Sequence, residues 1–105
     1  MAERAFFLNT LHPHVKPEDY EKWVREVDYP FARALPTIAR YDVTRIDGGV
    51  FGYDGDMPCQ FLEVVDVTDM EAYQAGAASG QFDDFLKEWS QYVASSVMIR
   101  GEVVE

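Results

Sequence analysis

The stretch KPEDYEKWVREVDYPFARALPTIARY, residues 16–41, decides how we expect this chain to fold. Pro17 suits a first helical turn, and the two acidic residues after it favour the positive end of a helix dipole. An apolar stripe at helical spacing follows, made of Tyr20, Trp23, Val24 and Val27. Pro30 cannot continue the hydrogen-bond ladder of a helix. The sequence therefore predicts a helix that breaks or kinks sharply at residues 28–30, and then a short turn over residues 31–35.

The rest of the chain shows strand and helix patterns in a regular order. Alternating or doubly apolar runs predict strands over Arg4–Leu11, Ile38–Ile46, Gln60–Val67 and Ser95–Val104. A capping box that starts at Thr68 predicts a second helix, which Ser79 and Gly80 divide before a clean helical periodicity over 82–93. The order β-α-β-β-α-β is that of the ferredoxin-like motif. We therefore expect one α+β domain over residues 1–105, with both helices on one face of a four-stranded antiparallel sheet.

Bulky apolar residues occupy both faces of three of the predicted strands, so the face without helices also needs a cover. The simplest cover is the same face of a second copy. Two sheets packed in this way form a symmetric dimer, and we expect a homodimer of the dimeric α/β-barrel type.

Composition excludes several classes of protein. The net charge is −10, with 19 acidic and 9 basic residues, which argues against binding to nucleic acid or to an anionic membrane surface. No apolar run is long enough to span a membrane, and no signal peptide is expected. The single cysteine, Cys59, reads as a small apolar filler and fits a cytoplasmic protein.

Cofactor and metal motifs are not readable in the sequence. The glycines between Asp47 and Pro58 do not join a strand to a helix, so they form no phosphate loop, and we interpret this segment as a mobile connection or lid. His12 and His14 flank a proline, and that spacing is weak evidence for a metal site. We therefore predict neither a metal nor a cofactor.

Acid–base chemistry remains, and four residues are candidates for it: Asp28, His14, His12 and Glu26. Asp28 is the first choice, because neighbouring aromatic residues at the predicted break could desolvate it and raise its pKa, although Arg33 would lower it. His14 is the second choice. The alternative is that both histidines are exposed loop residues and that Asp28 only caps the helix or pairs with Arg33.

A predicted pocket lies between the helices and the sheet. Candidate substrate-binding residues there are Asn9, Trp23, Arg33, Tyr41, Phe82, Phe85 and Trp89. Asn9 stands among bulky apolar residues, so it either ties down a loop or orients a ligand. We interpret the aromatic residues mainly as core residues. Some of them could also form the walls of a site for a planar, mostly apolar ligand.

The pattern YxxWVRxVDY at 20–29, followed by RxLPxIxxY at 33–41, resembles the REDY-like or HapK-like family. EVxDVTD at 63–69 and EW at 88–89 add to a resemblance that covers nearly the whole chain. It implies a dimeric α/β-barrel protein of a bacterial natural-product pathway, such as those making pyrrole- and indole-containing pigments. It also implies a small enzyme without cofactor, a cyclase or dehydratase acting on a reactive aromatic intermediate. Trp23, Asp28, Arg33 and Tyr41 are its pocket candidates.

Two alternatives to this function stay open. A cofactor-free monooxygenase on the same fold would consume oxygen and need an electron-rich phenolic substrate. A ligand-binding or stress-related module without turnover would have an aromatic pocket on which no polar group converges.

Overall fold

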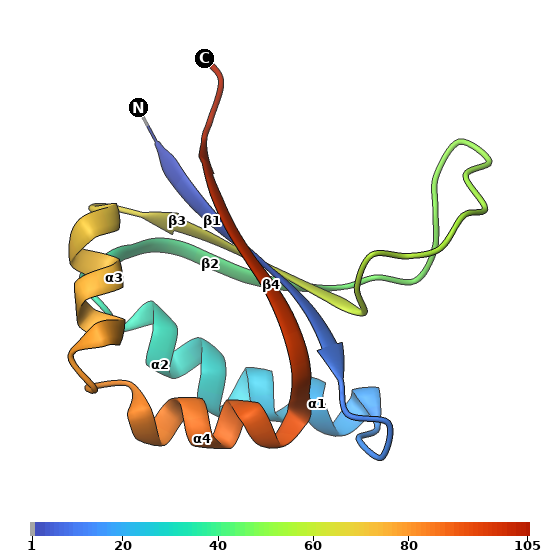
Figure 1. Ribbon diagram of the computed structural model, residues 1–105, viewed down its shortest axis with the longest axis horizontal. Helices are drawn as coiled ribbons and strands as arrows, with labels where there is room; N and C mark the ends of the chain where they lie inside the picture. The colour runs from blue at the N-terminus through green and yellow to red at the C-terminus, as the bar shows by residue number, and fades with distance from the viewer. Residues whose placement is uncertain (1) are drawn as a thin grey trace.

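The computed structural model describes residues 2–105 and places the elements in the predicted order (Figure 1). The strands are β1 (Glu3–Leu11), β2 (Ile38–Arg45), β3 (Phe61–Val67) and β4 (Val93–Glu102). The helical segments are α1 (Pro17–Trp23), the π-helical η1 (Val24–Asp28), α2 (Tyr29–Arg33), α3 (Met70–Ala78) and α4 (Asp83–Tyr92). Within residues 2–105, no helix has the length and apolar character needed to cross a membrane.

The four strands form one antiparallel sheet in the order β2-β3-β1-β4. The helices lie together on one side of it, as Figure 1 shows. The predicted ferredoxin-like α+β fold is therefore confirmed, and each strand ends within two residues of its predicted bounds. The predicted barrel requires a second copy and stays a prediction.

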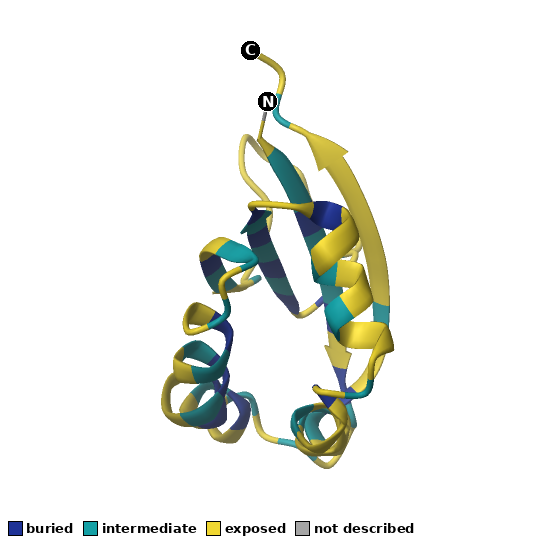
Figure 2. Cartoon of the chain, turned by 90° about the vertical axis from the view of Figure 1, so that its left-hand side faces the viewer, coloured by how far each residue is buried: buried dark blue, intermediate teal, exposed yellow. Residues whose placement is uncertain are grey.

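The strand register decides which side chains face the helices. Phe7 pairs with Glu63 on β3 and with Met98 on β4, so these three form one row across the helix-facing side. Along β3 buried and half-buried residues alternate, whereas β4 is exposed almost throughout (Figure 2). The opposite, open face of the sheet carries Phe6, Leu8, Leu62, Val64, Val97 and Ile99.

Two apolar clusters hold the helices to the sheet. The first joins α2 and α3 to the sheet through Ala5, Ala32, Tyr41, Val65, Val67 and Met70. The second joins α1 to the other end of the sheet through Leu11, Tyr20, Trp23, Val24, Phe61 and Val93. Burying large apolar side chains contributes about 1.5–3 kcal/mol each, so the two clusters hold the helices against this side of the sheet.

The first helical stretch continues past Pro30, so the predicted end of the helix there is wrong, although the π-helical segment η1 interrupts the α-helix just before that residue. The predicted kink stays a prediction. Backbone angles stay helical through Asp28 (φ −64°, ψ −54°) and Tyr29 (φ −58°, ψ −49°). The Tyr29 N–H donates to the Val24 carbonyl, five residues back, as in a π-helix. In an α-helix the proline ring would clash with the carbonyl four residues back, and the wider turn of η1 relieves that conflict.

The N-cap of the second helix lies one residue later than predicted. Asp69, not Thr68, is the N-cap, and its carboxylate accepts from the Ala72 N–H at 3.0 Å. The Thr68 hydroxyl instead donates to the Pro36 carbonyl at 3.2 Å and ties the start of α3 to the end of the first helical stretch. The predicted division between α3 and α4 is confirmed, and Gly80 there adopts a φ of 87° that favours glycine.

The connection between β2 and β3 has no regular secondary structure. It extends away from the sheet and the helices (Figure 1), and its residue Phe51 is fully exposed. None of its residues lines the cavity described below, so in this arrangement it does not cover that cavity. Its predicted mobility stays a prediction.

Candidate functional site

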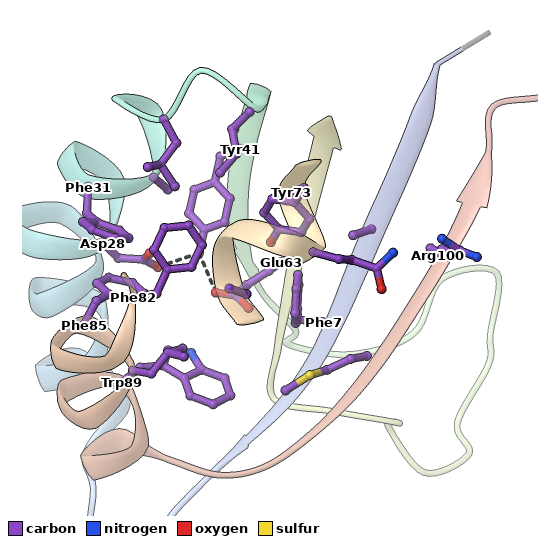
Figure 3. Close-up of a pocket in the computed structure, with 18 of the residues that line it drawn as sticks. Phe7, Asp28, Phe31, Tyr41, Glu63, Tyr73, Phe82, Phe85, Trp89 and Arg100 are labelled. Atoms are coloured by element: carbon purple, nitrogen blue, oxygen red, sulfur yellow. Dashed lines mark hydrogen bonds between the residues drawn. The ribbon is translucent and has the colours of Figure 1, made fainter. Parts of the chain in front are cut away.

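A cavity of about 940 Å³ lies between the helix-facing side of the sheet and helices α2, α3 and α4 (Figure 3). Its walls are mostly apolar and include Phe7, Phe31, Ile38, Met70, Phe82, Phe85 and Trp89. It opens toward β4, because the lining residue Met98 is 61% exposed and Arg100, two residues further on, is exposed as well. This volume suits a small organic molecule, and the aromatic lining suits one with planar rings.

Two carboxyl side chains and a phenol meet at the closed end of this cavity. Asp28 comes from the last residue of η1, Tyr41 from β2 and Glu63 from β3. The Tyr41 hydroxyl lies 2.7 Å from Asp28 Oδ2 and 2.5 Å from Glu63 Oε1 (Figure 3). Only 1% of Asp28 and 5% of Glu63 are exposed, so this carboxyl–phenol–carboxyl triad is shielded from solvent.

The triad geometry requires an extra proton. A phenol carries one hydrogen and donates it to one acceptor, while its oxygen can accept one from a second group. Two short contacts to two carboxyls are both hydrogen bonds only when one carboxyl is protonated and donates to Tyr41. The triad therefore shares two hydrogens, one from the phenol and one from a carboxyl, among its three interacting oxygens.

The electrostatics of the triad support this protonation. Burial and, to a lesser extent, the charge of Glu63 raise the pKa of Asp28 from 3.8 to about 7, against the opposing effects of the Tyr41 hydrogen bond and Arg33. Burial also raises the pKa of Glu63, against the opposing effects of the Tyr41 hydrogen bond and the nearby Asn9 amide. Burial and both carboxylates raise the pKa of Tyr41 far above its ordinary value, so Tyr41 stays a neutral donor. The pKa of Asp28 therefore lies near neutral pH.

Arg33 holds the strand that carries Tyr41. Its guanidinium donates to the Tyr41 backbone carbonyl at 3.3 Å and 2.9 Å and lies 3.8 Å from the centre of the Tyr29 ring. It also pairs with Asp42 at 3.5 Å. Arg33 does not line the cavity, so its effect on Asp28 is that of a nearby charge.

Aromatic rings build the wall opposite the sheet. Phe31 and Phe85 stack at 4.3 Å, and Phe82 meets Phe31 edge-on at 5.6 Å. Trp23 lies behind this wall, 5.4 Å from Phe85, and its indole N–H donates to Glu88 at 3.4 Å. Phe82, Phe85 and Trp89 therefore line the cavity as predicted, whereas Trp23 supports the wall from outside.

The chain matches the family model of the REDY-like protein HapK over residues 3–104. The chain belongs to the HapK family. Among solved structures, this HapK-family chain is similar to HapK from Hahella chejuensis, with 24% identity and a TM-score of 0.78 over 97% of this chain and 92% of the other. A dimeric ferredoxin-like protein of unknown function from Thermobifida fusca is 18% identical, with a TM-score of 0.70 over 98% and 92% of the two chains.

A third structure extends the similarity beyond the family. It is a Dabb family protein with a ferredoxin-like fold from Mesorhizobium loti, 16% identical, with a TM-score of 0.70 over 99% of this chain and 98% of the other. At these identities the structures show a shared fold. No curated protein sequence matches the HapK-family chain.

The structure separates the four predicted acid–base residues. Asp28 lines the cavity, but Glu26 is exposed on η1 and points elsewhere. His12 and His14 stack on one another at 5.5 Å beside Asp19, outside the cavity, and His12 Nε2 lies 2.9 Å from the Ser90 carbonyl. Within residues 2–105, no three His, Cys, Asp or Glu side chains come together as a metal site.

Asn9 lies on the helix-facing side of β1 and is fully buried. Neither atom of its side-chain amide has a hydrogen-bond partner within residues 2–105, and its backbone carbonyl accepts from the Gln60 N–H at 2.9 Å. It does not line the cavity, although it is close enough to lower the pKa of Glu63. Its role as a ligand-orienting residue stays a proposal.

Glu63 is the site residue that the sequence interpretation missed. It stands in FLEVVDV, where Phe61, Val65 and Val67 occupy the same face as Glu63. An acidic residue among apolar residues that face the core could have identified Glu63 as a site residue. Burying a carboxyl is costly unless it has a hydrogen-bond partner, so such a residue usually has a specific role. The opposite face of the same strand also carries an acid, Asp66, so alternation alone did not show which one was buried.

Proposed function

We propose that this protein is a small enzyme that works without a cofactor and moves protons on a planar, mostly apolar substrate. The reaction we favour is ring closure or loss of water on an aromatic intermediate of bacterial secondary metabolism, such as a pyrrole- or indole-bearing compound. Membership of the HapK family supports the substrate class. The carboxyl–phenol–carboxyl triad at the end of an aromatic cavity carries the proposal.

The triad offers an acid and a base in one place. In a dehydration, the ionised carboxyl takes a proton from a substrate carbon, while the protonated carboxyl or Tyr41 gives a proton to the neighbouring hydroxyl. The C–H and C–O bonds break, a double bond forms and water leaves. The triad ends with as many protons as it held at the start. In a ring closure, the same acid would protonate the carbonyl that an internal nucleophile attacks.

The apolar walls contribute by positioning and by excluding water. A planar substrate held between the sheet and the Phe31–Phe85 wall has fewer orientations to sample, which lowers the entropic part of the barrier. Excluding water keeps the pKa of Asp28 near 7, where a carboxyl can both give and take protons.

Convergence of polar groups favours an enzyme over a pure binding module. A non-catalytic module would have an aromatic pocket with no polar group directed into it. Here two buried carboxyls and a phenol reach the cavity together. Burying these polar groups lowers the stability of the fold. A protein that only binds an apolar ligand would gain nothing from that loss.

The test is turnover of pyrrole- and indole-bearing β-hydroxy carbonyl compounds, followed by mass spectrometry for loss of water. We expect product with the wild type and a loss of about a hundredfold or more in Asp28→Asn and Glu63→Gln. Asp56→Asn, in the exposed connection, is the matched control and should keep full activity. Full turnover in both folded triad variants would refute acid–base catalysis by this site.

Two other outcomes identify the alternatives. Oxygen uptake measured with an electrode, together with a product that has gained oxygen, would show a monooxygenase. Tight binding of the compounds without any product across the panel would show a binding module.

We also propose a homodimer that packs through the open sheet face. Half-buried Phe6, Leu8, Leu62 and Val64 form the centre of that face, next to exposed Val97 and Ile99. An apolar surface of this kind is costly in water and favours self-association. The similar Thermobifida fusca protein is described as dimeric, which supports the proposal.

A further inference from the structure

We propose that Arg100 binds an acidic substituent of the substrate at the mouth of the cavity, so that the enzyme selects elongated planar acids. The proposal rests on the proposed function, because it takes the cavity with the triad as the substrate site. It adds the chemical class of the substrate and its orientation.

The strand register directs Arg100 into the site. Arg100 on β4 pairs with Ala5 on β1, which is buried on the helix-facing side of the sheet. Residues opposite one another in an antiparallel pair project to the same face. Arg100 therefore projects toward the helices and lines the cavity, and its exposure places it at the open side next to Met98 (Figure 3).

The charges of the cavity are divided between its two ends. Arg100 is the one Lys or Arg among the lining residues, and it forms no ion pair with another residue of the described range 2–105. Asp28 and Glu63 occupy the closed end. An acidic group of a ligand would be repelled at the closed end and attracted at the mouth, where a guanidinium can hold a carboxylate through two hydrogen bonds.

The sheet geometry sets the length of the ligand. Glu63 and Met98 lie in one row, separated by β1, and Arg100 is two residues further along β4. With strands about 4.8 Å apart and a rise of about 3.4 Å per residue, the Cα atoms of Glu63 and Arg100 are roughly 12 Å apart. Two linked or fused rings with an acidic group at one end span such a distance once side-chain reach is subtracted. The reacting part of the molecule then lies at the triad.

A matched pair of probes tests the charge at the mouth. Binding of para-phenylbenzoate and of its neutral analogue para-phenylbenzamide is measured by calorimetry at neutral pH. We expect the wild type to prefer the acid, and Arg100→Met to weaken acid binding by roughly five- to tenfold while amide binding stays within about twofold. Arg100→Lys should keep part of the preference. Arg25→Met, an exposed arginine on η1 outside the cavity, should change neither.

Each contrary result overturns the assignment. Equal weakening of both probes would mean that Arg100 contacts the ligand through its aliphatic chain and not through its charge. An unchanged ratio in Arg100→Met, a preference for the amide in the wild type, or no binding of either probe would refute an anionic anchor. Turnover of the Asp28 and Glu63 variants is measured separately, so a failed anchor leaves the proposed function testable and a failed enzyme leaves the binding result intact.

Discussion

Replacing Asp28 by asparagine should make the protein more stable at neutral and alkaline pH. Asp28 is 1% exposed, and its pKa is raised from 3.8 to about 7, mainly by burial. A carboxyl with a raised pKa in the folded state binds more protons folded than unfolded between these two values. Folding stability therefore falls as pH rises from 3.8 to about 7, and stays low above that.

The interval between the two pKa values sets the size of the effect. At about 1.4 kcal/mol per pH unit, ionising Asp28 inside the protein costs about 4 kcal/mol by neutral pH and above. That is a large part of the roughly 5–15 kcal/mol that stabilises a typical domain. Glu63 acts with the same sign, because its pKa is raised as well. Asparagine has nearly the same shape and carries no charge, so it should remove most of this cost.

Urea unfolding from roughly pH 4 to pH 8, at fixed protein concentration, measures the effect. The wild type should lose stability across this range, and Asp28→Asn should show a much flatter profile and a higher free energy of unfolding at the alkaline end. Asp54→Asn removes the same charge from the exposed connection and serves as the control for the net charge of −10. If Asp28→Asn and Asp54→Asn both run parallel to the wild type, Asp28 is not a buried carboxyl that titrates near neutrality.

Three further predictions concern the triad and the sheet. Tyr41→Phe leaves two buried carboxyls without their shared partner, so it should lower the free energy of unfolding in urea by about 3 kcal/mol. The control Tyr53→Phe, in the exposed connection, should lower it by less than about 0.5 kcal/mol. Equal effects would mean that the triad hydrogen bonds add no stability. If the enzyme proposal holds, the turnover rate should change near pH 7, where Asp28 titrates, and Asp28→Asn should abolish that change; an unaltered profile would assign it to another group. Light scattering should give twice the chain mass for the wild type and a single chain mass for Val64→Asp on the open sheet face; a wild-type monomer at micromolar concentration would rule out the barrel.

The fold was predictable because its signals are local and repeated. Alternation of buried and half-buried residues marks β3 and helical periodicity marks α4. Apolar residues on both faces mark β1 as a strand and predict a sheet that is covered on two sides. The continuation of the helix through Pro30 was not predictable from the same signals. A proline is compatible with either the end of a helix or a π turn, and only the packing of the preceding residues decides between them.

The site was predictable in part. Asp28 could be chosen because it lies among aromatic residues, where burial raises its pKa. Tyr41 was also chosen, as a substrate-binding residue. Glu63 was not, because its contact with Tyr41 depends on the pairing of β2 with β3, which are joined by a long connection. Trp23 and Phe85 both follow helical periodicity, and periodicity does not distinguish a ring that faces a cavity from one that packs behind it.

The π-helical segment η1 has a consequence for the evolution of the family. A π turn holds one residue more than an α turn, so it corresponds to a single-residue insertion that the helix absorbs without a loop. Loss of one codon within 24–28 would restore a regular helix and rotate everything before it by about 100° relative to α2. Either the stripe of Tyr20 or the carboxyl of Asp28 would then leave its present side. We therefore expect relatives to differ here by whole-residue gaps, and an acid aligned with Asp28 across such a gap is not its structural equivalent.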